Sequence, residues 1–197
     1  MKLPAPIQKV VDELSELPSI GPRQAIRLAF YLIGEGKQNI RGLAMGIAGL
    51  ADIKICERCF FIHQNEGSLC DICKNPHRAQ NIIMIIEKET DLISLENTGK
   101  FAGRYFVIGE IPKTGFLEDW QKLRLQSLKK ELGEKKAEEI ILAFNPTSLG
   151  DLQASLLTKE LAPLTKRLSR LGRGLPTGGE IEFADDETLS SALERRS

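Results

Sequence analysis

Four cysteines within one short stretch constrain the fold of this chain more than any other feature. They form two Cys-x-x-Cys pairs that ten residues separate: Cys56 with Cys59, and Cys70 with Cys73. Zinc takes four tetrahedral ligands, and each Cys-x-x-Cys turn presents two thiolates to one ion. The pattern therefore predicts a single zinc ion with no open coordination position, which makes it structural. Four unligated buried cysteines are the alternative, and the paired spacing disfavours it.

Composition limits what the rest of the chain does. The 197 residues are 42% hydrophobic, so a packed core is available, and their formal net charge is zero. Nucleic-acid binding would therefore need local basic patches. No apolar run approaches the roughly 18 residues that span a bilayer. The residues after Met1 lack the apolar stretch of a signal peptide. We expect a cytoplasmic protein, in which thiols stay reduced.

The chain before the cysteines is predicted to be helical. Apolar residues from Ile7 to Leu17 recur at helical spacing, and Pro18 ends that segment. Gly21-Pro22 opens a second helix, because proline is favoured in a first turn. A third helix, loosened by glycines, is predicted over residues 39–53.

The chain after the cysteines predicts an α/β body. Apolar runs at residues 82–86, 105–108 and 140–144 read as buried parallel strands. The amphipathic stretches at 90–97, 118–132 and 149–161 read as crossover helices. Further strands are expected at 164–171 and 180–184, and a closing helix at 185–196.

The fold class is thus α/β with a helical head and a metal module. Four domains are expected: a helical region at 1–54, a zinc finger at 55–78, a mostly parallel sheet with flanking helices at 79–172, and a glycine-rich segment with a strand and a helix at 173–197.

The turn Leu17-Pro18-Ser19-Ile20-Gly21-Pro22 has the form of a helix-hairpin-helix loop. Gly21 lets backbone amides approach a phosphate, and the following helix points its positive end at the same place. Arg23 and Arg27 lie one turn apart beside it. We predict that Gly21, Arg23 and Arg27 bind DNA phosphates without reading sequence. An ordinary turn with solvated arginines is the alternative. Ile26, Ala29 and Ile33 are expected to form the buried stripe opposite.

A second basic cluster precedes the glycine-rich stretch at 174–179. It consists of Lys166, Arg167, Arg170 and Arg173. A DNA path, a subunit contact and a solvated strand edge all remain open for it.

These pieces, in this order, resemble the bacterial recombination mediator family RecR over nearly the whole chain. The matching elements are the hairpin from Leu17 to Phe30, the cysteine module with Asn75-Pro76-x-Arg78, Ile85-Ile86-Glu87 with Asp91-Leu92, Gly103-Arg104-Tyr105, Asn145-Pro146-Thr147, Arg173-Gly174-Leu175-Pro176-x-Gly178-Gly179, and Phe183-Ala184-Asp185.

The resemblance implies a Toprim domain for the α/β body and a ring-shaped homotetramer able to encircle DNA. It also implies cooperation with RecO and RecF in loading RecA onto single-stranded DNA at gaps. By position, Arg23 and Arg27 match the DNA-binding hairpin residues, and Glu87 matches the Toprim glutamate. The chain departs from the family at 109–116 and at Leu149-Gly150-Asp151, where acidic groups of the presumed Toprim face are lost.

Catalysis is not expected. Toprim enzymes hold magnesium with a glutamate and an Asp-x-Asp pair, whereas here only Glu87 and Asp151 remain on the acidic face, and Asn145-Pro146-Thr147 follows the third apolar run. No phosphate-binding loop of the Gly-x4-Gly-Lys type is present. A non-catalytic DNA-binding mediator is predicted. The alternatives are a magnesium-dependent Toprim nuclease or primase, and a zinc-ribbon interaction module that does not bind DNA.

Overall fold

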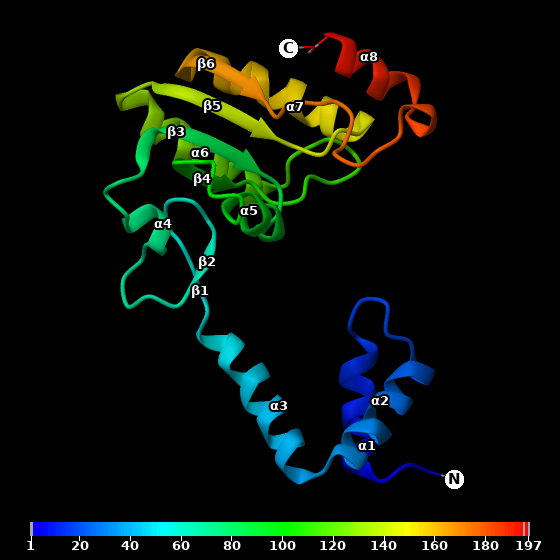
Figure 1. The fold of residues 1–197 in the computed structure, drawn as a ribbon. Helices are drawn as coiled ribbons and strands as arrows, with labels where there is room; N and C mark the ends of the chain where they lie inside the picture. The colour runs from blue at the N-terminus through cyan, green and yellow to red at the C-terminus, as the bar shows by residue number, and fades with distance from the viewer. Residues whose placement is uncertain (1, 195, 197) are drawn as a thin grey trace. The chain divides into compact units, whose positions relative to one another are not determined.

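The computed structural model describes residues 2–194 and 196, and the chain divides into two compact units, Met1–Ile53 and Lys54–Ser197 (Figure 1). Each unit has its own core. Among the described residues, no helix combines the length and the apolar character needed to cross a membrane.

The N-terminal unit is helical, as predicted. It contains α1 (Ala5–Ser15), α2 (Pro22–Glu35), α3 (Lys37–Gly49) and the 3-10 turn η1 (Leu50–Asp52). Pro22 begins α2 in the first turn. Gly36 ends it with a positive φ of 88°, a conformation that glycine adopts without strain. A small core of Val11, Ala25 and Ala29 joins α1 to α2.

The predicted buried stripe of α2 is partly wrong. Ala29 is buried, but Ile26 is 36% exposed and Ile33 is 51% exposed. The residues that face α1 are Ala25 and Ala29, one turn apart. Their small side chains permit a close approach of the two helices, and this leaves the larger isoleucines on the flank. In α3 no residue is buried at all.

The cysteine module opens the second unit. Its short antiparallel hairpin pairs β1 (Lys54–Ile55) with β2 (Ile62–His63), and the one-turn helix α4 (Asp71–Lys74) follows. The module belongs to the same compact unit as the large sheet that comes after it.

That sheet is four-stranded and entirely parallel, with strand order β4-β3-β5-β6. The strands are β3 (Ala79–Ile86), β4 (Gly103–Val107), β5 (Ala137–Ala143) and β6 (Thr165–Arg170). Ile86 lies beside Val107 on one side and Ala143 on the other, so the carboxyl ends of three strands meet at one edge. The three apolar runs and the expected strand at 164–171 are thereby confirmed.

Helices cover both faces of the sheet (Figure 1). They are α5 (Glu89–Glu96), α6 (Asp119–Glu134) and α7 (Ser148–Leu161), and the turn η2 (Ala162–Leu164) leads into β6. Leu92 of α5 packs on one face with Met84 and Tyr105. The other face holds the larger core, where Leu128 of α6 and Leu157 of α7 meet the strands. The predicted crossover helices are confirmed.

The C-terminal segment differs from the prediction in one element. The strand expected at 180–184 is instead the 3-10 turn η3 (Ile181–Phe183), and helix α8 (Asp186–Glu194) follows, which confirms the closing helix. A strand needs a neighbouring strand to bond with, whereas here the Phe183 amide donates locally to the Glu180 carbonyl at 3.2 Å. Ile181 and Phe183 are left exposed.

Candidate metal centre and nucleic-acid interface

The four cysteines converge. Their sulfur atoms all lie within 4.8 Å of one another, and every one of these residues is buried. Cys59 Sγ lies 3.5 Å from Cys70 Sγ. Tetrahedral zinc with bonds of about 2.3 Å would hold its sulfurs about 3.8 Å apart. The donor set, its closure and its spacing therefore fit one tetrahedral ion.

The protonation of the cluster also fits a cation. Hydrogen bonds from Cys59 and Cys73 lower the pKa of Cys70 to about 2. The same bond to Cys70, together with burial, raises the pKa of Cys59 above its usual range. Without a cation, burial and the neighbouring Cys70 thus disfavour ionisation of Cys59 and raise the pKa of Cys73 as well. A bound dication supplies the opposite charge that lets several thiolates coexist.

The cysteine module, here called the metal module (residues 54–74), packs on the sheet through its first Cys-x-x-Cys turn. The Val107 amide donates to the Cys59 carbonyl at 2.8 Å, which occupies the outer side of edge strand β4. Phe60 packs edge-on against Phe106 with ring centroids 5.5 Å apart. The Arg124 guanidinium covers Phe60 at 4.8 Å. The module therefore completes one margin of the sheet.

Two arginines share one carboxylate beneath the module. Arg58, between the first two cysteines, lies 2.7 Å from Glu131 of α6. Arg104 of β4 lies 3.0 Å from the other oxygen of Glu131 and is only 1% exposed. Burial lowers the pKa of Arg104, and the Glu131 charge opposes that shift. Sequence patterns do not indicate this pairing, because Glu131 lies far along the chain in a helix of mixed charge.

The predicted hairpin between α1 and α2 is exposed. The Ile20 amide closes the turn onto the Leu17 carbonyl at 3.1 Å, and Ser19 takes a positive φ of 66°. Gly21 caps α2 without any side-chain hydrogen bond. No side chain therefore competes with an anion for the first amides of α2.

The two predicted arginines also face solvent on α2. Arg23 and Arg27 are exposed, and neither has an acidic partner among the described residues. Unpaired guanidiniums next to open amides can hold phosphate oxygens through charge-assisted hydrogen bonds. The structure thus brings Gly21, Arg23 and Arg27 together on one exposed surface.

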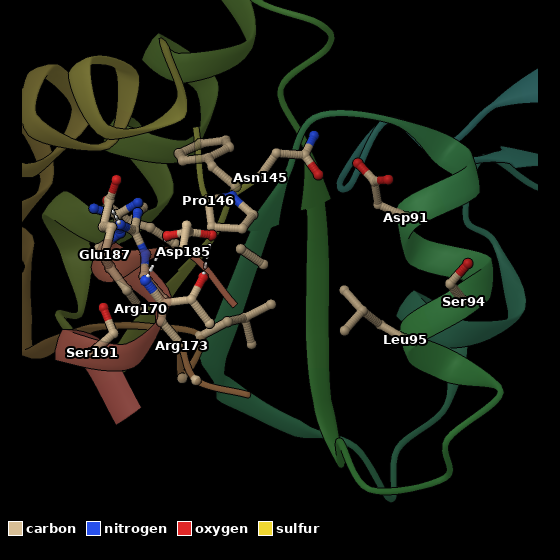
Figure 2. Close-up of a pocket in the computed structure, with 17 residues that line it drawn as sticks. Asp91, Ser94, Leu95, Asn145, Pro146, Arg170, Arg173, Asp185, Glu187 and Ser191 are labelled. Atoms are coloured by element: carbon tan, nitrogen blue, oxygen red, sulfur yellow. Dashed lines mark hydrogen bonds and ion pairs between the residues drawn. The ribbon is translucent and has the colours of Figure 1, made fainter. Parts of the chain in front are cut away.

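The predicted acidic face, with Glu87 and Asp151, lies at the carboxyl edge of the sheet. A pocket of about 540 Å³ opens there between α5 and the C-terminal segment, and Figure 2 shows Asp91, Ser94 and Leu95 on one side of it and Arg170, Arg173 and Ser191 on the other. Next to this edge, Asn145 Nδ2 donates to the Glu87 carboxylate at 3.3 Å. Burial raises the pKa of Glu87, and the charges of Asp91 and Glu110 raise it further.

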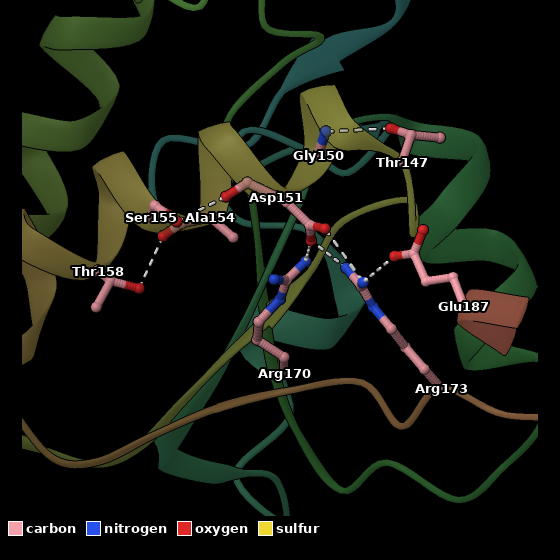
Figure 3. Close-up of polar contacts among 9 residues, drawn as sticks. All are labelled: Thr147, Gly150, Asp151, Ala154, Ser155, Thr158, Arg170, Arg173 and Glu187. Atoms are coloured by element: carbon pink, nitrogen blue, oxygen red, sulfur yellow. Dashed lines mark hydrogen bonds and ion pairs between the residues drawn. The ribbon is translucent and has the colours of Figure 1, made fainter. Parts of the chain in front are cut away.

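Asp151, the second predicted acid of this face, is tied to arginines (Figure 3). Arg173 bonds to its carboxylate, Arg170 lies 2.7 Å from it, and both hold the pKa of Asp151 below its usual value. Arg173 also pairs with Glu187 of α8 at 3.6 Å. Glu87 and Asp151 thus have different partners. Within the described residues the cysteines form the one cluster of three or more potential metal ligands.

The second basic cluster is neutralised by its neighbours. Lys166 pairs with Glu138, Arg167 with Glu139, and both Arg170 and Arg173 with Asp151. Lys166, Arg167 and Arg170 lie along β6, the other edge strand of the sheet, and Arg173 follows it. The pairing favours the strand-edge interpretation over a DNA path.

The segment at 109–116, one of the two departures noted above, packs against α6. Gly109 has a φ of 94° and lies under Trp120, where a Cβ would overlap the indole. Gln121 Nε2 donates to the Gly109 carbonyl at 3.2 Å. Glu110 pairs with Lys88 at 3.2 Å. The one acidic residue of segment 109–116 is therefore paired locally.

Comparisons with known proteins agree with one another. Three family models match it: the RecR helix-hairpin-helix at residues 7–49, the Toprim domain at 81–172 and the RecR C-terminal region at 174–197.

Curated relatives match over nearly the full length. The recombination protein RecR of Roseiflexus castenholzii is 41% identical, with 98% of this chain and 94% of the relative covered. That of Chloroflexus aggregans is also 41% identical, with 98% and 93% covered. That of Frankia alni is 38% identical, with 96% and 95% covered.

Proposed function

The chain belongs to the RecR family of recombination proteins, and on that premise we propose that it is a non-catalytic, DNA-binding mediator of recombination and DNA repair. The observation that carries the proposal is the exposed hairpin, where Gly21 leaves the first amides of α2 open and Arg23 and Arg27 stand without acidic partners.

In this proposal the hairpin grips the sugar-phosphate backbone. The amides of the first turn of α2 and the two guanidiniums donate hydrogen bonds to phosphate oxygens, and no side chain reads base edges. One copy supplies few charges, so affinity has to come from several hairpins acting together. A ring-shaped homotetramer would repeat the site by symmetry and raise its effective concentration.

The apolar surface of the N-terminal unit supports an assembly of copies. Ile40, Leu43 and Ile47 lie on one side of α3 and are all exposed, and large exposed apolar surfaces mark interaction sites in soluble proteins. By resemblance, the tetramer works in the cytoplasm with RecO and RecF and helps to load RecA onto single-stranded DNA at gaps.

The metal in this proposal is zinc, held by Cys56, Cys59, Cys70 and Cys73. Soft thiolate ligands in a closed tetrahedral set favour zinc and leave no position for a substrate. The ion would supply folding energy to the module, while the residues of the module hold β4 and α6.

The partners of the two Toprim acids support a non-catalytic role. Asp151 is neutralised by Arg170 and Arg173, and Glu87 accepts a hydrogen bond from Asn145. A two-metal site needs carboxylates that are free to bind cations. Incubation with labelled DNA and Mg²⁺ should give neither cleavage nor synthesis. An activity that Glu87→Gln abolishes would favour the nuclease or primase alternative.

The test of the hairpin is an Arg23→Ala/Arg27→Ala double variant. We expect DNA affinity, measured by fluorescence anisotropy at low salt, to fall more than tenfold. A Lys166→Ala/Arg167→Ala variant removes as much charge from paired positions and should bind like the parent. If the Arg23→Ala/Arg27→Ala variant binds DNA as well as the parent protein does, the proposal is refuted. The zinc-ribbon interaction module would then be the better hypothesis.

A further inference from the structure

The outer side of α2 carries more than two arginines. Tyr31 follows Arg27 by one turn, as Arg27 follows Arg23, so the three residues form a row along the helix. The buried residues Ala25 and Ala29 mark the side that faces α1. At about 100° per residue, the row lies within about 40° of the direction opposite to them.

The row combines charge with an exposed aromatic ring. Tyr31 is 61% exposed, and Arg23 and Arg27 are exposed as well. Gly34, the next position on this side of α2, adds no side chain and has open space around it. A flat group can therefore reach the face of the ring.

Glu35 lies one turn beyond Tyr31. Its carboxylate raises the pKa of the Tyr31 phenol, which keeps the ring neutral. The row thus runs from two cations through an aromatic ring to an anion. A polyanion would follow the cations as far as the ring and then leave the helix before Glu35.

We propose that Tyr31 is a stacking platform for an unpaired DNA base whose neighbouring phosphates are held by Arg23 and Arg27. This inference rests on the proposed function of the hairpin and names its substrate as single-stranded DNA. Every base has a face that can stack on an aromatic ring, whatever the sequence. In an intact duplex those faces are already stacked on neighbouring bases.

The apolar residues of α2 do not account for Tyr31. Ile26, Phe30 and Ile33 lie on one flank of the helix, and Tyr31 lies about 100° or more around the axis from each of them. A second copy of the chain that covers this apolar flank therefore leaves Tyr31, on the far side of the row, open to DNA.

The experiment measures the affinity of the full chain for a labelled oligothymidine and for a blunt duplex by fluorescence anisotropy. Tyr31→Ala should weaken oligothymidine binding on the order of tenfold and leave duplex binding unchanged. Tyr31→Trp keeps a stacking face and should bind like the parent. Phe116→Ala, which removes another exposed ring (78% exposed) in the second unit, is the matched control and should change neither affinity.

Three results for Tyr31→Ala would overturn the inference. They are an unchanged affinity for oligothymidine, an equal loss of affinity for oligothymidine and duplex, or a solution mass below that of the parent protein by light scattering. The last would mean that Tyr31 lies in a subunit contact. Failure of the hairpin itself looks different, because Arg23→Ala/Arg27→Ala would then bind both DNA forms like the parent. If Arg23→Ala/Arg27→Ala binds DNA weakly while Tyr31→Ala has the same effect on single-stranded and duplex DNA, only the proposed base contact is wrong.

Discussion

Glu131 is the carboxylate on which two guanidiniums converge, one from the metal module and one from β4. Arg104 is almost completely buried, so its charge depends on Glu131 for compensation. A buried ion pair contributes little net stability while it is intact, but the removal of one partner leaves an uncompensated charge.

Glu131→Gln is therefore expected to destabilise the second unit by about 3 kcal/mol. Urea denaturation of the metal-loaded protein measures this. Glu138→Gln breaks an exposed pair with Lys166 and should cost less than about 1 kcal/mol. If the two variants lose the same free energy of unfolding, water already compensates the charge of Arg104.

The cysteines give a second prediction at this scale. Cys70→Ser removes one of four ligands, and structural zinc in small modules contributes roughly 10–16 kcal/mol in apparent terms. We expect the variant to purify with less than one equivalent of zinc and to melt at a lower temperature than the parent. Elemental analysis and circular dichroism check this. A variant without zinc that kept the parent's helicity and melting temperature would contradict a structural role.

Among the elements, α7 and the C-terminal segment are joined by charge. Asp151, in the first turn of α7, binds Arg170 at the end of β6 and Arg173 at the start of the segment, and Arg173 reaches Glu187 of α8. The apolar residues Ile181, Phe183 and Leu193 of this segment are exposed, so its docking depends more than usual on these ion pairs.

Asp151→Asn should therefore loosen the C-terminal segment while the sheet persists. Hydrogen exchange is expected to quicken in α8 relative to β3, and the cost should be of the order of 1 kcal/mol because Asp151 is 37% exposed and screened by solvent. The control is Glu160→Gln, which breaks the pair between Glu160 near the end of α7 and Lys129 of α6. Unchanged exchange in α8 would show that apolar contacts suffice.

Acid should act in the same direction. Since the arginines lower the pKa of Asp151 in the folded protein, its contribution is complete above the ordinary aspartate value of about 3.9 and disappears as the pH falls through the lowered value. The segment should stay docked at neutral pH and loosen only in strong acid.

Sequence patterns predicted the elements that rest on local rules. The apolar runs of β3, β4 and β5 and the Pro22 start of α2 needed no tertiary information. The errors came where long-range packing decides. Ile26 and Ile33 satisfy helical spacing, but α1 packs on the alanines. The 180–184 stretch reads as a strand, yet no strand pairs with it.

The candidate sites divide in the same way. The four cysteines and the hairpin residues are close in sequence, so their spacing alone predicted that they would lie together. The ties of Glu87 to Asn145 and of Asp151 to Arg170 and Arg173 join strand ends that only the parallel sheet brings together. Residue types alone could not predict that the two acids take different partners.

For the whole molecule, salt dependence tests how many hairpins act together. Binding to duplex DNA weakens with a log–log slope of about 0.9 per phosphate neutralised. If four copies each used Arg23 and Arg27, up to about eight phosphates would be involved and the slope would approach about 7. A single copy would give a slope near 2.

Arg27→Ala should then reduce the slope by about half, and light scattering with and without DNA should report the mass of a tetramer. Affinity measurements over a range of salt concentrations provide the slope. A flat salt response, or the mass of one chain in the presence of DNA, would count against the ring.

The bond from the Val107 amide to the Cys59 carbonyl has a consequence for the protein without its metal. At one edge of the sheet, β6 carries the charged side chains of Lys166 and Arg167, which disfavour pairing with another chain. At the other edge, every residue of β4 is buried, and the module covers this strand. Loss of the metal would expose the backbone amides and carbonyls on the outer side of β4, with which a strand of another chain can pair. Protein treated with a chelator should accordingly aggregate and precipitate, which light scattering would detect.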